Sequence, residues 1–105
     1  MIRVLLLALV LVAGCSAGAA PPAGDLDLDL FADKPTPRRV ELRKDSKVKL
    51  TVHSDKPVDV HVHGFDKLAE ADRDRPARLE FTADRTGTFD VEAHPETLLA
   101  QLVVR

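Results

Sequence analysis

The chain has 105 residues, which is room for one domain. Fifteen Lys and Arg against seventeen Asp and Glu give a formal net charge of −2, and Phe is the only aromatic residue. Binding to nucleic acid needs a basic surface or aromatic platforms for base stacking, so the composition argues against nucleic acid as a partner. A single Cys cannot form an intrachain disulfide, so the apolar core must hold the fold by itself.

Residues 1–14 have the pattern of a lipoprotein signal peptide. Arg3 is followed by an uninterrupted apolar run, 4–13, which as a helix would span about 15 Å, roughly half of a bilayer core. The run ends in LVAGC (11–15), which resembles the lipobox of bacterial lipoproteins, where the Cys receives lipid and becomes the new N-terminus. We therefore predict lipidation of Cys15. The alternative is an ordinary secretory signal that leaves a free thiol.

Residues 15–24 are predicted to link this lipid to the domain. The stretch SAGAAPPAG (16–24) is small, uncharged and rich in Pro and Gly, which is typical of a flexible tether. A domain at 25–105 would then be anchored to the cell membrane and would face outside the cytoplasm. A lipidated Cys15 would also be unavailable as a metal ligand.

The remainder of the chain alternates apolar and polar residues with the period of two that predicts half-buried strands. The opening stretch, 25–31, alternates Asp with Leu and implies a strand with a wet outer face. Residues 64–76 are charge-dense and are predicted to form a surface loop. Strands are expected at 25–31, 39–43, 47–53, 58–63, 78–83 and 88–93, and a closing strand contains Leu102 and Val104. Seven short strands without a helix predict an all-β antiparallel sandwich or barrel.

Three of the four histidines could share a metal ion. His61 and His63 lie on one face of a predicted strand, with Cα atoms about 6.6 Å apart, so two imidazoles could bind the same ion. His94 follows the strand 88–93 and would join them if the strands ending at His63 and His94 reach the same end of the sandwich. His53 is expected to be solvated. A pair of histidines on a wet strand face commonly has no function, and this alternative stays open.

Residues 25–105 resemble small bacterial cupredoxin-like domains. The resemblance rests on the opening strand and on the stretches VELRKDSKVKL (40–50), DVHVHGFD (59–66) and LEFTADRTGTFDVEAH (79–94). It implies a Greek-key β-sandwich and a copper ligand from a His after the middle strand. His61 matches that His when the Phe and Asp of the family's H-x-x-x-F-D stretch are placed on Phe65 and Asp66. A gapped alignment matches His63 instead.

The chain departs from the family at the other copper ligands. In cupredoxins these come from the loop before the last strand and are usually a Cys, a His and a Met. Here Ala93 lies near the expected Cys and Leu98 lies where the Met would be, and residues 16–105 contain neither residue type. A blue-copper centre needs its thiolate, so the sequence argues against a blue-copper electron carrier.

A nitrogen and oxygen donor set remains. Such donors suit Cu(II) or Zn(II), whereas Cu(I) prefers sulfur. If Val60 and Val62 face the core, the two histidines between and after them point to solvent unless a bulge turns them. The donor set consists of His61, His63 and His94, with Asp59 or Glu92 nearby.

The sequence therefore predicts a membrane-anchored, extracytoplasmic, cupredoxin-like lipoprotein that binds Cu(II) or Zn(II) through histidines. The alternative is a metal-free sandwich that acts as an interaction or accessory lipoprotein, with contacts through the acidic opening strand or through 64–76. Catalysis is not expected, because Ser46 and Ser54 lie in predicted turns and no recognisable motif places a His to activate either.

Overall fold

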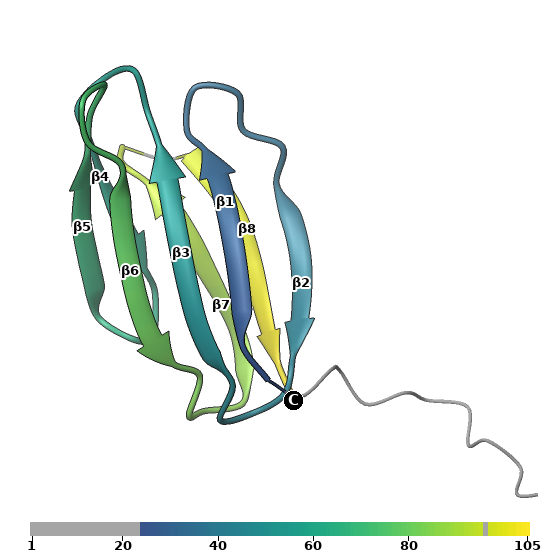
Figure 1. The fold of residues 1–105 in the computed structure, drawn as a ribbon. Coiled ribbons are helices and arrows are strands. Elements are labelled where there is room, and N and C mark those ends of the chain that lie inside the picture. Colours follow the sequence, from purple (N-terminus) through teal and green to yellow (C-terminus); the bar gives the residue numbers. More distant parts are fainter. Residues whose placement is uncertain (1–23, 96) are drawn as a thin grey trace, which may run out of the picture.

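The computed structural model describes residues 24–95 and 97–105, which form a sandwich of two β-sheets (Figure 1). One sheet has the strand order β1-β3-β6 and the other β2-β8-β7-β4-β5. This confirms the all-β sandwich expected from the sequence. The strands are β1 (Leu26–Phe31), β2 (Arg38–Leu42), β3 (Lys47–His53), β4 (Val58–Val62), β5 (Lys67–Ala71), β6 (Ala77–Thr82), β7 (Gly87–Ala93) and β8 (Thr97–Val104).

The predicted signal peptide, Cys15 and residues 16–23 of the predicted tether lie outside the described residues. Within the described ranges, no helix is long and apolar enough to cross a membrane.

Two strand pairs are parallel, which corrects the expectation of a purely antiparallel sandwich. β1 pairs with β3, and β2 pairs with β8, each in the parallel sense. The reason is that the chain crosses to the opposite sheet after each of the first three strands, so that β1 and β3 run the same way in one sheet (Figure 1). An alternation of period two is the same for both directions, so the pattern could not distinguish them.

The alternation decides which side of each strand enters the core. Leu50 and Val52 of β3 and Val60 and Val62 of β4 are completely buried. Their neighbours along the chain are polar and lie on the outer faces of the sheets. In the described part of the chain, all eight strands and the whole of this apolar core lie within residues 26–104, so we expect residues 24–105 to fold on their own.

The Asp side chains of the opening strand, β1, lie on the outer face of the three-stranded sheet. Asp27 of β1 is the register partner of Lys49 of β3, and Lys49 forms an ion pair with Glu80 of β6, with Nζ and Oε1 3.6 Å apart. Charges of alternating sign therefore cross the three strands. Both members of the ion pair are exposed, so the pair contributes less than about 1 kcal/mol to the free energy of folding. These charges keep this face of the sheet hydrophilic.

β5 corrects the prediction of a loop over 64–76 and makes eight strands where seven were predicted. It pairs antiparallel with β4 along its whole length. Ala71 is buried and Ala69 is half-buried, whereas Leu68 and Glu70 are exposed. The inward residues are small and the strand is rich in charge, which concealed the apolar alternation. Charged residues are common on a strand at the edge of a sheet, where they discourage pairing with other chains.

An aromatic cluster closes the end of the sandwich at which β4 turns into β5. The ring of Phe65 lies 4.8 Å from that of Phe81 and 4.5 Å from that of Phe89, and the guanidinium of Arg85 lies over it at 4.9 Å. Gly64 precedes Phe65 with φ of +85°, and a Cβ there would come within 2.4 Å of Phe89 Cδ1. Both the backbone and the close aromatic ring therefore require glycine at this turn.

Candidate metal-binding site

Three histidines lie together on the outer face of the five-stranded sheet. The ring centroid of His61 lies 4.4 Å from that of His63 and 6.1 Å from that of His94. Glu92 is the register partner of His61 on the neighbouring strand β7. We call His61, His63, Glu92 and His94 the histidine patch.

Burial of the valines in β4 turns the histidines outward. Val60 and Val62 are completely buried, so His61 and His63 face solvent, as the alternation of the sequence indicates. The pairing of β4 with both of its neighbours runs without a register shift. His61 is half-buried between the flanking strands, and the side chain of His63 is 49% exposed.

The histidines do not meet at one end of the sandwich. The sequence-based hypothesis required the strands that end at His63 and His94 to reach the same end, and the structure contradicts this. β4 and β7 are antiparallel, so the strand ends that carry these two residues lie at opposite ends of the pair. The backbone N–H of His63 donates to the carbonyl of Asp90, whereas that of His94 donates to the carbonyl of Asp59. The histidines instead lie along the sheet face, with His61 in contact with both of the others.

Glu92 orients one of the imidazoles. Its Oε2 accepts a hydrogen bond from Nε2 of His63 at 3.0 Å, and its side chain is 28% exposed. A carboxylate can only accept, so Nε2 carries the proton in this contact and Nδ1 of neutral His63 holds the free lone pair. Metal-binding histidines are commonly held by a carboxylate in this way. A register shift between β7 and β8 lies immediately before Glu92, where β8 has the additional residue Leu99.

No protein-family model and no curated protein sequence matches the chain. Solved structures do match. A copper binding protein, solved by NMR in the apo form, has 15% identity and a TM-score of 0.63, with 80% of this chain and 91% of that chain covered. The purple cupredoxin from Nitrosopumilus maritimus has 14% identity and a TM-score of 0.50, with 64% and 77% covered.

The fold is cupredoxin-like. A chain from a heme-copper terminal oxidase dimer also matches, with 17% identity, a TM-score of 0.56 and coverage of 87% of this chain and 76% of that chain. Identities this low show the fold alone.

Ala93, which the resemblance to cupredoxins places near the usual thiolate, has no side-chain atom that can bind a metal. Ala93 is 2% exposed, and its backbone pairs with that of Val60 in the sheet. Leu98, at the expected Met position, is half-buried. Residues 24–105 contain no Cys and no Met, so this cupredoxin-like domain has no sulfur ligand for a blue-copper centre.

The histidine patch fits Cu(II) or Zn(II) by donor chemistry, but as an incomplete set. Imidazole and carboxylate are ordinary ligands for both ions. However, the described part of the chain contains no group of three or more His, Cys, Asp or Glu side chains placed to hold a metal ion. The ring centroids of His61 and His63 are 4.4 Å apart and those of His61 and His94 are 6.1 Å apart, so His61 and His63 form the closest pair. One chain thus offers two neighbouring imidazoles to a metal ion.

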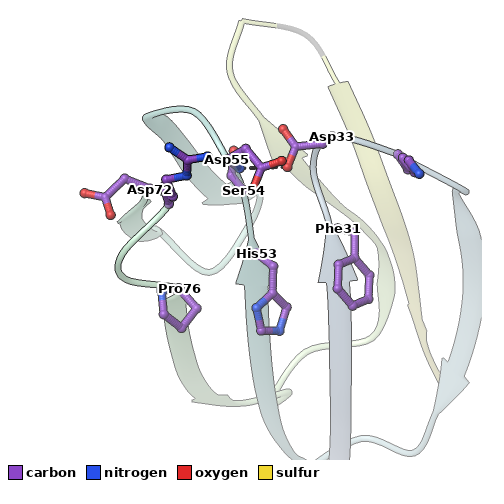
Figure 2. Close-up of a pocket in the computed structure, with 9 residues that line it drawn as sticks. Phe31, Asp33, His53, Ser54, Asp55, Asp72 and Pro76 are labelled. Atoms are coloured by element: carbon purple, nitrogen blue, oxygen red, sulfur yellow. Dashed lines mark hydrogen bonds between the residues drawn. The ribbon is translucent and has the colours of Figure 1, made fainter.

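His53 lies apart from the histidine patch, on the three-stranded sheet. Its ring stacks on that of Phe31 with centroids 4.9 Å apart, and its Nε2 lies 3.1 Å from Oδ1 of Asp29. His53 and Phe31 line a shallow hollow of about 520 Å³ (Figure 2). The side chain of His53 is 42% exposed, in keeping with a solvated residue. Its contact with Phe31 depends on the parallel pairing of β1 with β3, which the sequence did not indicate.

Proposed function

We propose that this chain is an extracytoplasmic cupredoxin-like lipoprotein that binds Cu(II) or Zn(II) through the histidine patch and does not act as a blue-copper electron carrier. The observation that carries the proposal is the contact between His61 and His63, whose ring centroids are 4.4 Å apart beside the carboxylate of Glu92. Two imidazoles this close, one on β4 and one directly after it, can bind one ion with little rearrangement, because a zinc-bound nitrogen lies only about 2 Å from its metal.

The cellular location is proposed from the sequence. The apolar run at 4–13, the lipobox-like LVAGC and the tether together support a lipid anchor at Cys15. A domain held outside the cytoplasm meets metal ions that enter the cell envelope, which suits a metal-binding role. The membrane, reached through the lipid anchor, is therefore the partner that we propose from the sequence.

A metal-free interaction protein is the second candidate. It is favoured by two exposed apolar side chains, Phe31 at 56% and Leu68 at 66% exposure, which lie on opposite sheets. Single exposed apolar residues are ordinary on protein surfaces, however. Three neighbouring histidines in or directly after two paired strands are a more specific indication of a metal-binding role.

We propose no catalytic role. Ser54 is buried, and its hydroxyl donates to the carbonyl of Lys56, so it is engaged in a local turn. Ser46 is likewise buried at 5% exposure. A hydroxyl nucleophile must instead be exposed to substrate and held by a base.

Calorimetric titration of residues 24–105 with Cu(II) and Zn(II) tests the proposal. The test variant is His61→Ala/His63→Ala/His94→Ala, and the matched control is His53→Ala, which removes the histidine of the opposite sheet. Because Trp and Tyr are absent, circular dichroism and copper d–d absorbance would follow the protein. We expect saturable binding that the control retains and the triple variant loses. Binding that survives in the triple variant, or no binding to the wild-type domain, would refute the metal-binding function.

A further inference from the structure

The histidine patch supplies too few ligands for a closed metal site. Zn(II) in structural sites is almost always bound by four ligands in a tetrahedron. His61 and His63 supply two, and the described residues hold no group of three placed for a metal. Both imidazoles project from the outer face of a sheet, so the empty coordination positions of a bound ion would point away from the chain. Those positions are open to a second molecule.

We infer that a second copy of this chain completes the site, so that His61 and His63 of both copies bind one metal ion on a two-fold axis. This inference rests on the proposed metal binding at the same residues. A two-fold arrangement brings identical surfaces together, so two ligands from each copy make the four that a tetrahedral ion requires. The expected stoichiometry is one ion for two chains.

The surroundings of His61 suit contact with a second copy. Leu68 is its register partner on β5 and is 66% exposed, so an apolar side chain lies beside the imidazole on the same outer face. In a two-fold contact, each copy would contribute this Leu68 to an apolar margin around the ion. β5 is one of the two edge strands of its sheet, so that margin is open to an approaching molecule.

The charges on this face also suit a shared cation. Asp59 of β4 and Glu70 of β5 are register partners, and both are exposed on the same side as His61. With Glu92, each copy therefore brings three carboxylates to the face that carries His61. Two such faces would repel each other without metal, and a divalent cation between them reduces that repulsion. Association is therefore expected to depend on the metal.

Sedimentation velocity of residues 24–105 with and without Zn(II), together with calorimetric stoichiometry, tests the inference. We expect a monomer in chelator, a dimer with Zn(II), and saturation at one ion for two chains. Leu68→Lys places a positive charge beside the ion in each copy and is expected to weaken dimerisation at least about tenfold while all imidazoles remain. Phe31→Lys is the matched control, because it changes the other exposed apolar residue on the opposite sheet and should leave the dimer intact.

The outcomes separate the inference from the proposed function. A monomer that binds one ion per chain, with loss of binding in the triple histidine variant, overturns the shared site and supports the metal-binding function. No binding by the wild-type domain removes both. A dimer that persists in chelator, or one that Leu68→Lys leaves unchanged, contradicts the shared site.

Discussion

Glu92 faces His61 across the β4–β7 pair, and its carboxylate is hydrogen-bonded to His63, the residue directly after β4, with Oε2 and Nε2 3.0 Å apart. One residue thus pairs with His61 in the sheet and bonds the imidazole of His63. It can hold the ring of His63 with Nδ1 free for a metal, and its negative charge favours a bound cation.

Glu92→Gln is expected to weaken the binding of Cu(II) or Zn(II) by about tenfold or more, because loss of a carboxylate that supports a metal-bound histidine usually has an effect of that size. Competition titration against a chelator of known affinity would measure the change. Glu80→Gln, which removes an exposed carboxylate on the opposite sheet, is the control and should have no effect. Equal affinity of the Glu92→Gln variant and the wild type would show that this contact does not support a metal site.

Leu50→Ala is expected to lower the free energy of unfolding by about 2–5 kcal/mol, because Leu50 is completely buried at the centre of β3 and the change leaves a cavity. Leu68→Ala makes the same chemical change at a side chain that is 66% exposed and should alter stability by less than about 0.5 kcal/mol. Urea unfolding followed by circular dichroism would measure both. Similar losses in the two variants would contradict the position of the core.

Gly64→Ala is expected to destabilise the domain by more than about 1 kcal/mol, because the residue has φ of +85° and its new Cβ would meet the ring of Phe89. Gly24→Ala is a useful comparison. Gly24 also has a positive φ, but nothing in the described part of the chain lies within 4 Å of its Cβ position, and it precedes the first strand. Thermal unfolding should therefore show a clear loss at Gly64 and a smaller one at Gly24, and the reverse order would refute the close packing at the β4–β5 turn.

Cys15→Ser is expected to abolish lipid attachment when the full chain is expressed in a bacterium, because only the thiol can receive the lipid. Detergent phase partition and intact-mass measurement would follow the change, with the wild-type protein in the detergent phase and the variant in the aqueous phase. A wild-type protein without added lipid mass would refute the lipid anchor and leave the ordinary secretory signal as the explanation of residues 1–14.

Strand positions follow from the sequence because burial alternates with every residue of a strand. The six strands predicted with both bounds begin and end within one residue of the observed ones, including 47–53 and 58–63. β5 is the exception. Its inward positions carry Ala69 and Ala71, which give a weak apolar signal, and its pairing with β4 supplies the stability that its own residues do not indicate.

The sequence by itself determined that the domain is an all-β sandwich without sulfur ligands, and that His61 and His63 share one face. These properties depend only on composition and on the alternation of neighbouring residues. Tertiary structure alone decided that β1 and β3 are parallel and that His94 lies beside His61 through the pairing of β4 with β7. The physical reason is that such contacts join residues far apart in the chain, and the choice of partner strand depends on how the whole core packs.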